Sequence, residues 1–149
     1  MIDTKSTVRI ERTYQAPADA VFAAWTSPEV MRRWWRVEQG WGESDAEVDL
    51  RVGGDIRVVM HDTDKDAEYG GGGKYTEIDP PNRLAFTWLW DDDDRRTLIE
   101  IDFEEVDGAT KVSFTHSGLW DEQAVRDHEG GWTGILARLA SMLEEQPRG

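Results

Sequence analysis

The sequence predicts an α+β fold, a curved antiparallel sheet of about seven strands wrapped around a long C-terminal helix. Three observations predict it. Apolar residues at every second position recur through most of the chain, which is typical of half-buried strands. One segment near the C-terminus instead carries apolar residues at helical spacing over about six turns. The chain has 149 residues, which fits a single domain.

The N-terminal part of the chain predicts one strand followed by two short helices. Apolar residues of the segment 7–16 recur at every second position, which favours a half-buried strand. Pro17 suits the first turn of a helix over residues 18–26, because proline lacks the N–H that a helix start leaves unpaired. Ser27 as an N-cap and Pro28 as the first helical residue predict a second short helix.

Six antiparallel strands are expected in the middle of the chain, because apolar and polar residues alternate there between turn-rich segments. Residues 62–73 are expected to form a polar loop before the third of these strands. The glycines at 70–73 fit a flexible loop entry, or a strand start close to another backbone. The six strands are expected over about residues 46–52, 56–61, 74–78, 84–90, 99–103 and 112–116.

The last element is a helix expected over residues 122–145, with Asp121 as its N-cap. Its apolar positions follow the i, i+3, i+4, i+7 spacing and form one continuous apolar face. These positions are Val125, His128, Trp132, Ile135, Leu136, Leu139, Met142 and Leu143. Because the strands form one run and the helices lie mostly at the ends, we expect the sheet to curve around this helix.

The charge of the chain argues against nucleic-acid binding. There are 31 acidic and 17 basic side chains, which give a formal net charge of −14. Phosphate binding requires clustered Lys and Arg, and only Arg32, Arg33 and Arg36 form a dense basic cluster here. The acidity fits either a high-salt cytoplasm or an ordinary acidic surface.

The composition also indicates a compartment. The chain has no cysteine, which excludes disulfides and cysteine-ligated zinc, so nothing requires an oxidising environment. No apolar run approaches the roughly 20 residues of a membrane span. Residues 1–10 lack the apolar stretch of a signal peptide. We therefore expect a cytoplasmic protein, monomeric or homodimeric, that does not insert into a membrane.

Three motifs for metal or phosphate binding are incomplete. Residues 128–132 resemble a zinc-protease helix, but the fifth position holds Trp instead of His. Residues 68–75 lack the first glycine and the final Ser or Thr of a phosphate loop. Residues 62–73 lack the glycine and the glutamate of a calcium loop. The sequence therefore predicts no metal ligand, no cofactor and no catalytic residue.

Two histidines fall on the expected apolar faces. His116 shares its side of the last strand with Val112 and Phe114, and His128 lies one helical turn before Trp132. A neutral imidazole in a cavity can act as an acid or a base near pH 7. The alternative is that both are hydrogen-bonded histidines of the core or its rim.

Several short segments, in this order and at these spacings, resemble one family over nearly the whole chain. They are APADAVFAAW at 16–25, SPE at 27–29 leading to WW at 34–35, GG at 53–54, IDPPNRL at 78–84 with FTW at 86–88, THSGL at 115–119 and HEGGW at 128–132. Together they resemble the activator of heat-shock protein 90 ATPase-like family, which belongs to the START-related, birch-pollen-allergen-like (SRPBCC) superfamily.

This resemblance implies a helix-grip fold: one START-related domain over residues 1–149, with its core over about residues 7–143. It also implies a deep cavity between sheet and C-terminal helix, where relatives hold lipids, sterols, polyketides or other apolar molecules. We therefore expect a small-molecule binding protein for an apolar or aromatic ligand, rather than an enzyme. The alternatives are a polyketide cyclase- or isomerase-like enzyme that uses a cavity histidine, and a co-chaperone-like interaction module with a protein partner.

Four of the eight tryptophans are candidates for the cavity wall, and about half of the eight are expected to be plain core packing. Pockets of this kind are mainly apolar with a few orienting polar groups, a role that the two histidines would fill. The remaining candidates are large apolar residues. Some are included because their predicted side faces inward. Others are included because they lie at the end of the second helix, where the resemblance places the cavity mouth. The candidate ligand-binding residues are Trp34, Trp35, Met60, Phe86, Trp88, His116, His128, Trp132 and Leu136.

Overall fold

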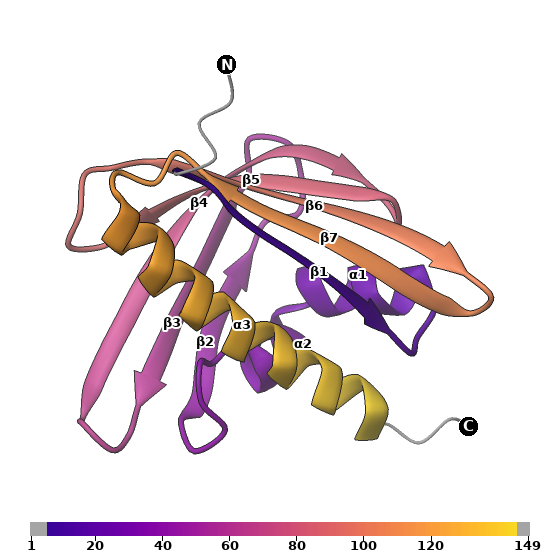
Figure 1. Ribbon diagram of the computed structural model, residues 1–149, viewed down its shortest axis with the longest axis horizontal. Coiled ribbons are helices and arrows are strands. Elements are labelled where there is room, and N and C mark those ends of the chain that lie inside the picture. Colours follow the sequence, from indigo (N-terminus) through magenta and orange to yellow (C-terminus); the bar gives the residue numbers. More distant parts are fainter. Residues whose placement is uncertain (1–5, 146–149) are drawn as a thin grey trace.

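The computed structural model describes residues 6–145 and shows one curled antiparallel sheet that wraps around a long helix (Figure 1). The strand order is β1-β7-β6-β5-β4-β3-β2. The strands are β1 Val8–Tyr14, β2 Gly42–Val48, β3 Asp55–Asp62, β4 Ala67–Asp79, β5 Arg83–Trp90, β6 Thr97–Val106 and β7 Ala109–Ser117. The helices are α1 Ala18–Thr26, α2 Pro28–Trp34 and α3 Glu122–Glu145. The predicted helix-grip fold is therefore confirmed.

The helix boundaries agree closely with the sequence, because their signals are local. At α3, the backbone N–H of Ala124 donates to Asp121 Oδ1 over 2.7 Å, so Asp121 caps the helix as predicted. At α2, Ser27 occupies the N-cap position, but its side chain makes no capping bond and instead donates to Glu29 Oε2 over 3.1 Å. The predicted position is confirmed, whereas the side-chain cap is wrong. Within residues 6–145, no helix combines the length and apolar character that a membrane span requires.

The middle of the sheet departs from the prediction in two places. The expected loop over 62–73 is wrong, because β4 already begins at Ala67 and contains the whole glycine run. Gly73 pairs there with β3, and a Cβ at this position would collide with the carbonyl oxygen of Thr87 on β5. In addition, β2 ends at Val48, and Leu50 and Val52 are exposed in the following turn instead of continuing the strand.

The core lies between the concave face of the sheet and the three helices. Alternate residues of β3, β6 and β7 are buried, as the two-residue periodicity predicts, and β5 follows the same pattern except that Ala85 is also buried. The centre of the core is aromatic: the Trp25 ring from α1 lies 4.7 Å from Trp34, 6.1 Å from Phe114 and 6.4 Å from Trp132, measured between centroids. Contact between these rings joins both short helices, the sheet and α3 around one cluster.

We expect a methyl group at Gly73 to destabilise the fold. The Gly73→Ala variant has to move β4 away from β5, and overpacking of this kind lowers the free energy of unfolding by about 1–3 kcal/mol. Urea denaturation measures the change. Gly130→Ala is the matched control, because a Cβ at this α3 position meets nothing within 4 Å. This control should be as stable as the wild type or slightly more so. Equal stability of the two variants would contradict the close approach at Gly73.

Candidate functional site

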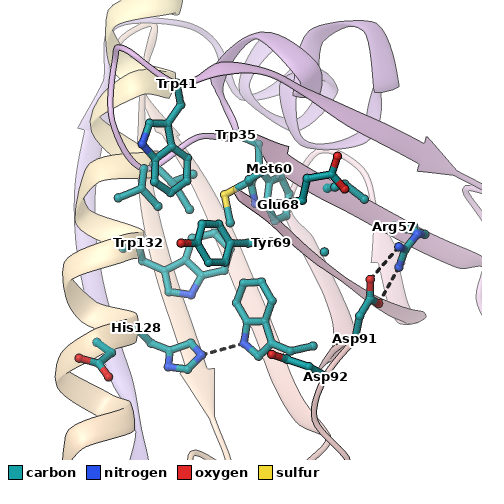
Figure 2. A pocket seen from close by; sticks show the side chains of 17 residues that line it. Trp35, Trp41, Arg57, Met60, Glu68, Tyr69, Asp91, Asp92, His128 and Trp132 are labelled. Carbon is teal, nitrogen blue, oxygen red and sulfur yellow. Dashed lines mark hydrogen bonds and ion pairs between the residues drawn. The ribbon is translucent and has the colours of Figure 1, made fainter. Parts of the chain in front are cut away.

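A pocket of about 580 Å³ opens between α3, the β3–β4 hairpin, the end of β5 and the segment that follows α2 (Figure 2). Five aromatic residues line it, namely Trp35, Trp41, Tyr69, Trp90 and Trp132. The other lining residues are Val37, Arg57, Val59, Met60, Glu68, Gly70, Asp91, Asp92, Asp127, His128, Gly131 and Ile135. The wall is thus mainly apolar and aromatic, and its charged groups come from strand ends, the hairpin tip after β5 and one position of α3.

The inner end of the pocket is formed by Trp35 at the end of α2. Its backbone N–H donates to Met31 O over 3.0 Å, and its carbonyl oxygen accepts a hydrogen bond from Ser44 Oγ on β2. The Trp35 ring stacks on Trp88 at 5.7 Å and meets the edge of Trp132 at 5.5 Å. Because both backbone and ring are held, Trp35 provides a fixed inner wall.

The other end of the pocket carries a stacked pair of rings from two separate segments. Trp41 and Tyr69 lie 5.6 Å apart with an angle of 18° between their planes. Arg36 Nη1 donates to the carbonyl oxygen of Trp41 over 2.9 Å and thereby fixes the segment after α2. The Tyr69 side chain is 41% exposed, so this pair forms the mouth of the pocket rather than its interior.

The segment after α2 lies directly against α3, because the backbone of Val37 comes close to Gly134. A Cβ at position 134 would collide with the carbonyl oxygen of Val37, so only the glycine present there allows this contact. Val37 consequently lines the pocket beside Gly131 and Ile135 of the same helix. The place of Val37 in the pocket wall therefore depends on Gly134, which lies about one helical turn after Gly131 on α3.

His116 is fully buried and belongs to a chain of hydrogen bonds. Trp132 Nε1 donates to His116 Nδ1 over 3.0 Å, which leaves the ring proton on Nε2. Nε2 therefore donates to Thr97 Oγ1 over 2.7 Å, and the Thr97 hydroxyl donates to Trp88 O over 3.0 Å. Burial, with a smaller effect of the neighbouring His128, lowers the pKa of His116 to about 3. The imidazole is thus neutral at physiological pH.

His128 is half-buried on α3 and lines the pocket. Trp90 Nε1 donates to His128 Nε2 over 3.0 Å, as the dashed line in Figure 2 shows. The proton then lies on Nδ1, which donates to the carbonyl oxygen of Ala124 over 2.7 Å. The rings of His128 and His116 are 5.1 Å apart and perpendicular. Both nitrogens of both histidines are therefore bonded within the protein.

An ion pair closes one side of the pocket. Arg57 donates from Nη1 and Nη2 to the two carboxylate oxygens of Asp91, each over 2.8 Å. The hydrogen bond from Arg57 lowers the pKa of Asp91, and the same bond raises the pKa of Arg57. Glu68, Asp92 and Asp127 are exposed carboxylates on the rim of the same pocket.

The structure divides the nine candidate site residues into two groups. Those that line the pocket are Trp35, Met60, His128 and Trp132. Those that lie behind it, buried in the core without lining it, are Trp34, Phe86, Trp88, His116 and Leu136. Trp34 is held away from the mouth because its Nε1 donates to Ala24 O over 3.0 Å within the helix pair. A ligand-binding role for the first group stays a prediction.

Three aromatic lining residues are absent from the candidates. Trp90 continues the inward side of β5 after Phe86 and Trp88, so the alternation alone indicated it. Tyr69 lies in the segment expected to be a loop, where its glycine neighbours carry no alternation. Trp41 follows α2 in a turn, in which its N–H donates to Glu38 O, and no periodicity marks its direction.

We expect His116 to contribute a pH dependence of stability. Its folded pKa of about 3 lies below the ordinary value of 6.5, so the unfolded chain binds one more proton between these values. Stability is therefore fully present above about pH 6.5 and falls towards pH 3 by at most about 1.4 kcal/mol per pH unit from this group.

The variant His116→Gln can keep both hydrogen bonds but does not titrate. Urea denaturation at several pH values should show a less stable protein at pH 7 and a smaller decline between about pH 6 and 4. Parallel declines in variant and wild type would contradict a neutral, buried His116.

Comparisons with known proteins agree with the fold and the element order. The family model described as Activator of Hsp90 ATPase homolog 1-like protein matches residues 15–144. A search of curated proteins finds no match. A protein from Chromobacterium violaceum is 24% identical, with a TM-score of 0.81 over 94% of this chain and 99% of the other.

Two further solved structures are more similar in sequence. The AHSA1 protein from Silicibacter pomeroyi is 29% identical, with a TM-score of 0.78 over 93% of this chain and 97% of its own. A protein from Rhizobium leguminosarum is 30% identical, with a TM-score of 0.74 over 94% and 95%. The match of the family model over most of the chain is decisive: this chain belongs to the Activator of Hsp90 ATPase homolog 1-like protein family.

Proposed function

We propose that the protein binds a small, mainly apolar or aromatic molecule in the pocket between α3 and the β3–β4 hairpin. The observation that carries this proposal is the aromatic wall around about 580 Å³ of space. This volume lies within the range of about 300–1,000 Å³ that is usual for small-molecule sites. Trp35 and Trp132 are 1% and 4% exposed and form a fixed floor, whereas the more accessible rings of the wall belong to Trp41, Tyr69 and Trp90.

The hydrogen bonds of the two histidines support binding rather than turnover. A general acid or base must reach the substrate with a ring nitrogen. In His116 and His128, every ring nitrogen already bonds to Thr97, to a tryptophan or to a carbonyl oxygen. The cyclase- or isomerase-like alternative would require at least one of these bonds to break. Family membership supports the proposal only through the shared fold. Because one fold can carry many functions, the argument for binding comes from the pocket itself.

The cytoplasmic location and the monomeric or homodimeric state stay predictions from the sequence. The nature of the natural ligand is accessible by native mass spectrometry of protein purified from its own host. A co-purifying small molecule that dissociates on mild activation would support the proposal. A bare mass, together with no thermal shift across a library of lipids and aromatic compounds, would oppose it.

We expect the Gly131→Leu variant to block the pocket. Gly131 lines the pocket, and a Cβ there meets only Val37 Cγ2, at 3.9 Å, so a larger side chain extends into the space. Gly130→Leu is the matched control, since a Cβ at this neighbouring position meets nothing within 4 Å and Gly130 does not line the pocket. Both variants change the helix propensity of α3 equally.

The neutral fluorescent probe N-phenyl-1-naphthylamine serves for the measurement. Its affinity should fall by about tenfold or more in Gly131→Leu and stay unchanged in Gly130→Leu, because loss of the contact area of one ring costs more than about 1.4 kcal/mol. Equal affinities in the two variants would place the bound probe elsewhere on the protein.

A further inference from the structure

The charge around the pocket is one-sided. Among the described residues that line it, Arg57 is the only Lys or Arg, and both of its terminal nitrogens are bonded to Asp91. In the described part of the chain, Asp92 and Asp127 form no ion pair, whereas Glu68 lies 3.5 Å from Nδ1 of His61, which is outside the pocket wall. An anionic ligand would therefore meet uncompensated negative charge and no unpaired guanidinium.

The acidic rim surrounds exposed aromatic faces. Figure 2 shows Trp41 at one end of the pocket and Asp92 towards the other, with Tyr69 between them. Aromatic faces carry negative electrostatic potential and attract cations within about 6 Å of the ring centre. The stacked Trp41–Tyr69 pair and Trp90 thus favour the same sign of charge as the carboxylates, through a different physical effect.

We propose that the ligand is an organic cation, in which an ammonium group is attached to an apolar or aromatic body. This inference rests on the proposed binding function and specifies its ligand class. The body lies against Trp35, Met60 and Trp132 in the inner part of the pocket. The ammonium group lies at the mouth, where the rings of Tyr69 and Trp90 and the carboxylate of Asp92 stabilise it.

Three probes of the same size separate charge from apolar contact. These probes are 2-naphthylmethylamine, which is a cation at pH 7, 2-naphthylmethanol, which is neutral, and 2-naphthoate, which is an anion. Isothermal titration calorimetry should show tightest binding for the amine and weakest for the naphthoate, with about tenfold or more between them in about 20 mM salt. The difference should shrink in about 500 mM salt, because salt screens the exposed carboxylates.

Matched variants test whether the amine preference is only the general attraction of cations to an acidic protein. Asp92→Asn combined with Asp127→Asn removes two rim charges, and Asp94→Asn combined with Glu129→Gln removes two exposed charges from the same hairpin tip and the same helix outside the pocket. Only the first pair should lower the preference for the amine, by about threefold or more, without weakening 2-naphthylmethanol. Tyr69→Leu should also lower the preference, since it keeps apolar bulk but removes the ring.

Each contrary result has a definite meaning. Naphthoate that binds as tightly as the amine would overturn the cationic ligand class and leave the binding function standing. If both pairs of charge variants lower the amine preference equally, or if Tyr69→Leu does not change it, the preference comes from the overall charge of the protein. Either result would overturn the inference. Failure of all three probes to bind would overturn both this inference and the proposed function.

Discussion

The fold and the pocket both depend on the packing of Trp35. Its ring lies 5.5 Å from Trp25, 5.4 Å from Trp34, 5.7 Å from Trp88 and 5.5 Å from Trp132. These contacts connect the consecutive helices α1 and α2 with β5 and α3, which come much later in the sequence. Each well-oriented aromatic pair adds about 0.5–1.5 kcal/mol beyond the area that it buries. Since Trp35 also lines the pocket, the inner wall is as rigid as the core behind it.

The role of His116 and His128 in the structure is to accept hydrogen bonds from tryptophan side chains. An indole N–H removed from water usually has an acceptor, and His116 and His128 supply one each for Trp132 and Trp90. Elsewhere in residues 6–145, the buried Nε1 atoms of Trp25 and Trp88 have no hydrogen-bond partner. The indoles of Trp90 and Trp132 are thus fixed by imidazoles, Trp34 by the carbonyl oxygen of Ala24, and the internal Trp25 and Trp88 by ring packing. In this structure the histidines orient the wall of the site.

The sequence prediction was most accurate where the structural signal lies within a few neighbouring residues, and least accurate where it depends on tertiary contacts. Pro17 and Asp121 mark the starts of α1 and α3 through backbone chemistry within one turn, and both boundaries are correct. The second half of β4 was predicted over 74–78, whereas its first half was expected as a loop, because Gly70–Gly73 carry no side chains that could alternate. Of the two readings of these glycines, the strand start close to another backbone is correct, since Gly73 lies against Thr87 of β5. Alternation gave the inward side of Phe86 and Trp88 correctly. It contains no information on depth, and Trp35 covers Trp88 from the pocket.

The residues that the sequence did not indicate are concentrated where ligand selection would occur. Trp41 and Tyr69 come from a turn and from a strand end, so their contact is formed by tertiary structure alone. The inner wall is made of apolar rings whose other faces fill the core, so it can change little without loss of stability. The mouth combines the exposed Tyr69, the half-buried Trp41 and exposed carboxylates, which fill no part of the core. Within one stable fold, the chemistry of the ligand can therefore be set mainly by the mouth residues, independently of the inner wall.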